Sequence, residues 1–307
     1  MAVTLPQAAL LSQDTLTRGV IQTFVQTSPI LDRIPFLEIE GNAYRYNSEG
    51  TLPGVAFRGV NEAYVESTGT VNQASEGLVI LGGDADVDTF IQKTRSDLND
   101  QRAVQTAMKV KAASYKYQDA FFNGDVTVEP KGFDGLKKRL VGGQVIDAAT
   151  NGMDIVAAGH DFLDALDALL ALTDADVIYG NKKAIGKVNS VLRRLGGGDW
   201  ITEAATGKRV PTYNGLPILD PGKTAAGVDI LPQTETVGTA SDTSSLYAVK
   251  FGQDEGDGGV TGLTNGGVSV RDMGEVDDKP AFRTRIEFFT GLAVFAGSAA
   301  ARLRGVK

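Results

Sequence analysis

The chain contains no cysteine and only one histidine among its 307 residues. Without cysteine it can form no disulfide framework, no thiolate metal site and no cysteine nucleophile. A single histidine also excludes metal sites built from several histidines. The 38 acidic side chains outnumber the 30 basic ones, which gives a formal net charge of −8. This negative charge argues against a protein whose main role is to bind the phosphates of nucleic acids.

Long hydrophobic runs are also absent. The longest charge-free apolar stretch near the C-terminus, residues 288–301, is interrupted by Gly291 and Gly297. It is shorter than the roughly 20 residues that a membrane-spanning helix needs. Residues 1–13 carry no Lys or Arg, so the basic region of a signal peptide is missing. We therefore expect no membrane partner and folding in a cytoplasm.

Glycine, by contrast, is abundant, with 37 residues, and this favours many turns. Residues 1–40 have the pattern of an arm, with a short amphipathic helix predicted over 14–26 and prolines at 29 and 35 that end regular structure. The segment after this helix is too apolar to remain in water, so the arm should lie on another surface: Ile30, Leu31, Ile34, Phe36 and Leu37.

Residues 41–83 contain eight glycines between short alternating runs such as 43–46 and 55–58. These runs are strand signals separated by turns. Their apolar content is too small for a core, so we expect a long two-stranded excursion. An isolated hairpin is marginal in water, and this one should need a partner surface.

The clearest helix is predicted over 98–122, and it would extend over about 38 Å. Its expected apolar stripe consists of Val104, Ala107, Met108, Ala112, Tyr115 and Phe122. Further helices are predicted over 161–172 and 182–195. Strands are predicted over 176–179, 216–219, 246–251, 268–271 and around 282–295. This mixed order indicates an α+β fold.

Two segments partly match a phosphate-binding loop and a calcium-binding loop, but each lacks residues that its motif requires. Gly222-Lys223-Thr224 lacks the earlier glycine of a phosphate-binding loop, since that position is Pro217. Asp84, Asp86 and Asp88 resemble the start of a calcium loop, but the sixth position is Thr89 and the twelfth is Arg95. A strand with its acids on one face explains them better. Weak cation binding at the acidic loop 254–259 stays open.

No catalytic constellation stands out. His160 lies at a helix start without a neighbouring nucleophile pattern, and the carboxylates of Asp164 and Asp167 are expected to be solvated on a helix face. The basic clusters 137–139 and 193–194 are interpreted as exposed faces, with contact to nucleic acid or a neighbouring chain as the alternative. We expect no cofactor, no metal and no enzymatic activity.

Several segments together resemble the major capsid proteins of tailed double-stranded DNA bacteriophages, which have the Hong Kong 97-like fold. In the first part of the chain these are DAFFNGD at 119–125 and GFDGL at 132–136, with ADVIYGN at 175–181 and YNGLPI at 213–218. Later segments are SLYAVKFG at 245–252, GVTGL at 259–263, RDMGE at 271–275, RIEFFTGLAV at 285–294 and AAARLRGV at 299–306. The similarity extends from about residue 98 to the end, and the element order matches over the whole chain.

The resemblance implies five parts. These are an N-terminal arm over 1–40, an extended loop over 41–83, and a peripheral domain over 84–151 that contains the long "spine" helix. An axial domain over 152–270 and closing peripheral strands over 271–307 complete the chain.

The resemblance also implies function. The chain would assemble with itself into hexamers and pentamers of an icosahedral shell in the virion, built in the host cytoplasm. Its other expected partners are neighbouring capsomers, weakly held double-stranded DNA on the inner face, a portal, and scaffolding or decoration proteins. The expected interface lies on arm and loop: Ile34, Phe36, Tyr44, Arg45, Phe57, Arg58 and Tyr64.

Two alternatives stay open at this point. One is an encapsulin-like compartment that encloses cargo enzymes, and the other is a small-molecule enzyme. One family member joins its subunits by Lys–Asn bonds from the extended loop, but the first lysine here is Lys93. We therefore expect non-covalent contacts. The short arm also predicts that no internal scaffolding segment is present.

Overall fold

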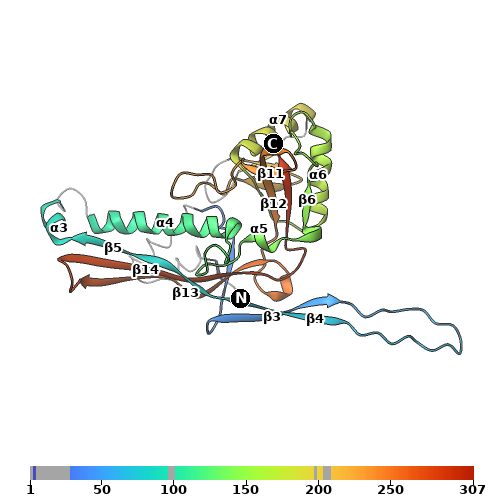
Figure 1. Cartoon of the computed structure of the whole chain (residues 1–307), viewed down its shortest axis with the longest axis horizontal. Helices are drawn as coiled ribbons and strands as arrows, with labels where there is room; N and C mark the ends of the chain where they lie inside the picture. The colour runs from blue at the N-terminus through green and yellow to red at the C-terminus, as the bar shows by residue number, and fades with distance from the viewer. Residues whose placement is uncertain (1–2, 5–27, 96–100, 197–198, 203–208) are drawn as a thin grey trace.

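The computed structural model describes residues 3–4, 28–95, 101–196, 199–202 and 209–307. The helix predicted over 14–26 lies outside these residues. The described chain has a flat, elongated part, a compact part beside it, and a hairpin that projects from the flat part (Figure 1).

The flat part is a five-stranded sheet with the order β1-β2-β13-β14-β5. Its strands are β1 (Val3–Thr4), β2 (Pro35–Glu38), β5 (Val79–Asp88), β13 (Val260–Glu275) and β14 (Ala281–Val294). The long helix α4 (Gln101–Asn123) lies along one face of this sheet, and the short α3 (Thr89–Arg95) precedes it (Figure 1).

The helix predicted over 98–122 is thus present, but of its predicted stripe only Phe122 is buried. The buried side chains are Thr106, Val110, Ser114, Tyr117, Gln118, Phe121 and Phe122. Val104 and Met108 point to solvent instead, and Met108 is 61% exposed. Sequence periodicity found an apolar face of the helix, but the sheet packs on a neighbouring face that mixes aromatic and small polar residues.

The compact part is a sheet of eight strands within the described residues, in the order β6-β15-β12-β7-β10-β9-β8 with β11 beside β12. The strands are β6 (Val145–Asp147), β7 (Val177–Tyr179), β8 (Asp199–Thr202), β9 (Arg209–Tyr213), β10 (Leu216–Leu219), β11 (Glu235–Val237), β12 (Ala240–Val249) and β15 (Ala300–Val306).

Two helices belong to this second part, and both were predicted: α6 (Gly159–Ala171) and α7 (Lys182–Leu195). Asn181 caps α7 by accepting a hydrogen bond from the Lys183 backbone N–H at 2.8 Å. Gly196 ends it in the left-handed conformation at φ 76°. The buried face of α7, Ala184, Val188, Val191 and Leu192, packs in a core with Phe162, Leu166 and Leu169 of α6.

The sheets do not follow the boundary expected at residue 270. β13 begins at Val260 and belongs to the flat sheet, whereas β15 at the C-terminus pairs with β12 in the compact sheet. The chain therefore crosses between the two parts more often than its sequence suggested. Pairing between strands far apart in the sequence decides which sheet each strand joins. The signals that suggested a boundary at residue 270 are local, so they could not show this pairing.

The apolar segment of the arm lies on another surface, as expected, but that surface belongs to its own subunit. Ile30, Leu31, Ile34 and Phe36 are all buried in the subunit's own core, with Ile34 at 0% exposure. The Phe36 ring lies against Tyr117 and Phe288, and a Cβ at Gly262 would stand 2.5 Å from the ring. Removing residues 1–40 would therefore remove part of the subunit's own core.

Candidate assembly interface

The hairpin of β3 (Ala43–Thr51) and β4 (Thr70–Gly77) projects away from both sheets (Figure 1). The two strands pair antiparallel from Ala43 opposite Gly77 to Thr51 opposite Thr70. They form a two-stranded sheet of their own. Such a ribbon has no core, so its stability depends on its base and on whatever it contacts.

The base of the hairpin is held by aromatic rings. Tyr46 is buried and meets the Phe295 ring edge-on at 5.0 Å between centroids, while Tyr44 lies 6.1 Å from the same ring. The Tyr46 hydroxyl donates a hydrogen bond to the Val294 carbonyl at 3.0 Å. Burial, followed by the nearby Glu76 carboxylate, raises the pKa of Tyr46, so this hydroxyl remains a donor.

A charged pair fixes the other strand. Arg139, from the short helix α5 (Leu136–Arg139), grips Glu76 of β4 with both terminal nitrogens, at 2.5 Å to Oε1 and 2.7 Å to Oε2. The Arg139 Nε also donates to the Asp134 carbonyl at 2.6 Å. Both partners are largely shielded, with side-chain exposures of 17% and 18%. Bidentate pairs of this kind are among the stronger charged contacts in proteins.

A third contact comes from the acidic loop. The short turn η2 (Glu255–Asp257) places Glu255 so that its Oε1 accepts a hydrogen bond from the Asn47 backbone N–H at 3.0 Å. We call these three contacts, Tyr46–Val294, Arg139–Glu76 and Glu255–Asn47, the hairpin latch. They set the direction in which the hairpin leaves the subunit.

The tip, residues 52–69, is different in character. Most of its large apolar side chains are almost completely exposed: Leu52, Val55, Phe57, Val60, Tyr64 and Val65. Arg58 stacks over the Tyr64 ring at 5.1 Å and donates from Nη1 to the Glu62 carbonyl at 3.0 Å. Polar contacts therefore shape the tip, but its own subunit leaves each of these apolar side chains at least 70% exposed.

The predicted interface residues separate into three groups. Phe57, Arg58 and Tyr64 lie together at the exposed tip, and Arg45 is exposed on β3. Tyr44 is half-buried at the base. Ile34 and Phe36 are core residues of their own subunit, where a neighbouring copy cannot reach them.

The latch residues Glu76, Arg139 and Glu255 were not predicted. The cluster 137–139 was interpreted as an exposed face, yet each of its cations has an acidic partner inside the subunit. Lys137 pairs with Glu235 at 3.5 Å and Lys138 with Asp134 at 3.4 Å and with Asp125, while Arg139 holds Glu76. The basic run was the available signal, but two of the partners, Glu76 and Glu235, lie far away in the sequence.

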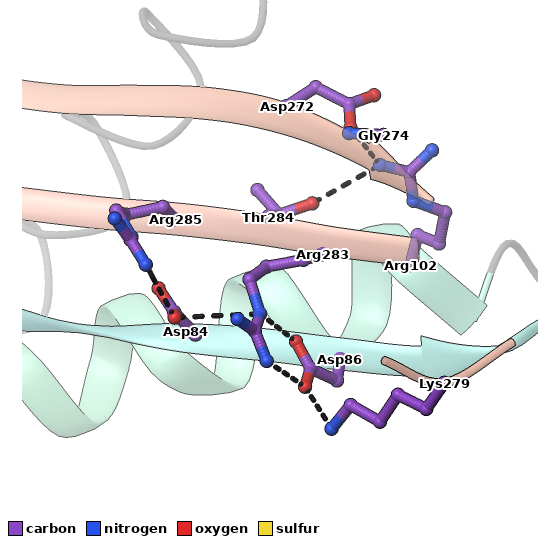
Figure 2. Close-up of polar contacts among 9 residues, drawn as sticks. All are labelled: Asp84, Asp86, Arg102, Asp272, Gly274, Lys279, Arg283, Thr284 and Arg285. Atoms are coloured by element: carbon purple, nitrogen blue, oxygen red, sulfur yellow. Dashed lines mark hydrogen bonds and ion pairs between the residues drawn. The ribbon is translucent and has the colours of Figure 1, made fainter. Parts of the chain in front are cut away.

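The three acids Asp84, Asp86 and Asp88 lie on β5, as the strand interpretation predicted. On the face of the sheet away from α4, Arg285 holds Asp84 with bonds of 2.8 and 2.9 Å. Arg283 holds Asp86 at 2.7 and 2.8 Å, and Lys279 approaches Asp86 at 2.5 Å (Figure 2). These hydrogen bonds lower the pKa of both carboxyl groups. The cross-strand ladder joins the edge strand β5 to β14.

The opposite face carries a further ion pair. Arg102, at the start of α4, donates to Asp272 of β13 at 2.6 Å and contacts Thr284 of β14 at 3.4 Å (Figure 2). Its guanidinium also lies 5.1 Å from the centre of the Phe282 ring. The long helix is thereby fixed to the far end of the sheet.

Metal and phosphate sites were the other possibilities that the sequence raised. No group of three His, Asp or Glu side chains among the described residues is placed to hold a metal ion. No helix among those residues is long and apolar enough to span a membrane. Gly222 lies in a turn with a positive φ of 90°, and the neighbouring Lys223 pairs with Asp229 at 3.4 Å. This segment is therefore a loop, as predicted, and does not have the form of a phosphate-binding loop.

A family model described as major capsid protein GP7 matches residues 12–165, which is 165 − 12 + 1 = 154 of the 307 residues and so half of the chain. The chain belongs to this family of major capsid proteins. Membership implies that the subunits assemble with one another into capsomers. It also implies a structural role in the capsid of a virion.

Solved structures agree on the fold. The chain is similar to the capsid of a native GTA particle, with a TM-score of 0.62 and 17% identity over 92% of this chain and 91% of that one. It is also similar to a structure of Microbacterium phage Oxtober96, with a TM-score of 0.59 and 13% identity over 91% of each chain.

An encapsulin shares the fold as well. The holo-SrpI encapsulin complex from Synechococcus elongatus PCC 7942 gives a TM-score of 0.66 and 19% identity, over 98% of this chain and 94% of that one. At such identities the likeness shows the fold alone, and the family match indicates a phage capsid protein. No curated protein matches the sequence significantly.

Proposed function

We propose that this major capsid protein forms hexamers and pentamers that close an icosahedral shell around double-stranded viral DNA. The observation that carries the proposal is the hairpin tip, whose apolar side chains are exposed on the single subunit. Exposed apolar groups gathered on a projecting element favour burial against another chain. A ring of identical copies supplies that second chain for every tip.

The charge of the subunit supports the DNA part of the proposal. A formal net charge of −8 suits a wall that confines DNA without binding it tightly. A portal, and scaffolding or decoration proteins, would complete the particle, and assembly would take place in the host cytoplasm.

The encapsulin-like alternative differs in what the shell contains. Its supporting observation is the fold likeness to the Synechococcus encapsulin over nearly the whole chain. Particles purified from an infected or induced host should contain DNA that survives external nuclease. Particles filled with a co-purifying enzyme would support the alternative instead.

Electron microscopy of the chain expressed alone, or with its scaffolding partner, tests the assembly itself. We expect closed shells from the full chain. A variant in which residues 54–67 are replaced by a short glycine-serine turn should fold and remain unassembled, because the latch is intact and only the tip is lost. Normal shells from this variant would contradict the proposed role of the hairpin.

A further inference from the structure

The chain contains four Asn-Gly pairs, at 123–124, 151–152, 214–215 and 265–266. In such a pair the backbone nitrogen of the glycine can attack the side-chain amide carbon of the asparagine and close a five-membered ring. Glycine permits this attack because it has no Cβ in the way and its backbone rotates freely. The folded structure decides which pairs react, since ring closure needs local movement of the backbone.

The pair at 265–266 lies in a bulge of β13. The strand pairs regularly with β14 up to Thr264 and again from Val268, so residues 265–267 lie opposite Phe289 alone. The two bulge glycines, 266 and 267, have positive φ angles of 76° and 68°, and a Cβ on either would meet nothing within 4 Å. The asparagine and the first glycine are exposed. The backbone of this bulge therefore has room to rotate.

The side chain of Asn265 is weakly held. Among the described residues it makes one hydrogen bond, from Nδ2 to the Gly41 carbonyl at 3.4 Å, which is long for such a bond. No carboxylate in that part of the chain is hydrogen-bonded to its amide. This matters because negative charge develops on the ring atoms as the ring closes, and a neighbouring carboxylate would oppose it.

Two of the other asparagines do have a carboxylate beside the reacting amide. Nδ2 of Asn123 donates to Asp119 at 3.0 Å, and Nδ2 of Asn214 donates to Asp167 at 3.3 Å. The nitrogen of residue 124, which would have to attack, is also held in a hydrogen bond to the Ala120 carbonyl at 3.0 Å. Both sites are therefore disfavoured by charge, and the first one also by hydrogen bonding.

The fourth asparagine, Asn151, is locked by its surroundings. Its Oδ1 accepts a hydrogen bond from the Thr239 backbone N–H at 3.1 Å, and a Cβ on Gly238 would stand 2.3 Å from the same oxygen. The attacking nitrogen of Gly152 donates to the Ala149 carbonyl at 3.2 Å. Ring closure here would have to break these contacts first.

We propose that Asn265 is a site of spontaneous deamidation and that, in the folded chain, it reacts before the other three asparagines. The Gly266 nitrogen bonds to Cγ of Asn265, and the side-chain nitrogen leaves as ammonia with the hydrogen that the Gly266 nitrogen gives up. Water then adds across one of the two ring bonds between carbon and the Gly266 nitrogen. Breaking the bond to Cγ gives aspartate, and breaking the bond to the backbone carbonyl carbon gives isoaspartate.

Conversion changes a contact at the root of the hairpin. Gly41 lies between β2 and β3 with a φ of 100°, and its carbonyl accepts from the Asn265 amide. A carboxylate only accepts hydrogen bonds, so it cannot replace the amide and is repelled by the carbonyl oxygen. Each converted subunit also gains one negative charge. Deamidation would thus loosen the segment that leads into the hairpin.

Peptide mapping by mass spectrometry tests the proposal on the full wild-type chain. Folded protein would be incubated at mildly alkaline pH, and the conversion of each of the four asparagines would be followed over time. We expect Asn265 to react about tenfold faster than any of the other three, which corresponds to about 1.4 kcal/mol in activation free energy. The matched control is the same chain unfolded in urea, where the four rates should lie close together.

Two results would overturn the site. One is a folded-state rate at Asn265 no greater than that at Asn214, which is also exposed. The other is the same ranking in urea as in the folded chain, since the order would then come from the local sequence and not from the bulge.

The effect on the hairpin root has its own test. We expect the variant Asn265→Asp to raise amide hydrogen exchange over residues 39–43, whereas Asn214→Asp, the same change at another exposed turn, should leave exchange there unaltered. Equal exchange in the two variants would overturn the proposed loosening.

Discussion

Asp84 and Asp86 show how single residues hold the edge of the long sheet. Each carboxylate is gripped by an arginine of the neighbouring strand β14. Their pKa values are lowered chiefly by hydrogen bonds from Arg285 and Arg283. In the unfolded chain both would titrate near pH 4. Their contribution to stability is therefore complete above about pH 4 and is lost as the pH falls toward the lowered, folded-state values.

The substitution Asp86→Asn tests this ladder. We expect the free energy of unfolding at neutral pH to fall by on the order of 1 kcal/mol. We also expect a smaller further loss between about pH 4 and pH 2, because the titrating group is gone. Urea unfolding at several pH values measures both. Asp164→Asn is the control, as Asp164 is exposed and forms no ion pair in the described part of the chain. Equal acid sensitivity of wild type and Asp86→Asn would contradict the expectation.

Phe57 and Arg58 are adjacent at the tip, but they differ in how much they can contribute to the stability of an assembled shell. Burying a phenylalanine side chain against a neighbour is worth about 1.5–3 kcal/mol, whereas an exposed ion pair is worth about 0–1 kcal/mol. We therefore expect Phe57→Ala to lower the dissociation midpoint of shells in urea more than Arg58→Ala does. Arg58→Ala also loses the stacking on Tyr64, so the reverse order would show that tip shape matters more than buried area.

At the scale of elements, the hairpin depends on its latch. In Glu76→Gln the largely shielded guanidinium of Arg139 loses its counter-charge, and a polar group left without its partner away from water costs about 1–3 kcal/mol. We expect faster amide hydrogen exchange in β3 around Tyr44 and Tyr46, with the two sheets unchanged. The control Glu66→Gln makes the same chemical change at an exposed tip position. Unchanged exchange in Glu76→Gln would mean that the aromatic contacts suffice.

The long helix α4 gives a second test at this scale. Val110 is completely buried, whereas Met108 is mostly exposed. We expect Val110→Ala to lower the free energy of unfolding by about 1–2 kcal/mol, through lost burial and a small cavity. Met108→Ala should change it by no more than about 0.5 kcal/mol in unassembled subunits. A larger effect of Met108→Ala would mean that the predicted stripe, which includes Met108, faces the core after all.

At the scale of the whole molecule, we expect the proposed shell to be held by non-covalent contacts. The first lysine of the chain is Lys93, so residues 1–92, which include the whole hairpin, offer no amine side chain for an amide cross-link. Arg45 and Arg58 cannot replace it, because a guanidinium stays protonated. We expect boiled, denatured particles to run on a gel as single subunits. A ladder of covalent oligomers from the wild-type chain would refute this.

Local patterns in the sequence determined much of this molecule. The periodicity of α6 and α7, the alternation on β5 and the glycine-rich excursion were each readable, since they depend on neighbours a few residues away. The same holds for the exposed tip, because Phe57 and Tyr64 lie where no core can form around them. The order of these elements also carried the resemblance to phage capsid proteins.

Tertiary structure alone decided which face of each element is buried and which distant residues meet. Phe36 became a core residue because Gly262 makes room for its ring. Arg139 became the anchor of the hairpin because folding brings Glu76, 63 positions earlier, within reach. The C-terminal strand joined the compact sheet through pairing with β12. Such choices depend on contacts between segments far apart in the chain, and no local pattern of hydrophobic and charged residues records them.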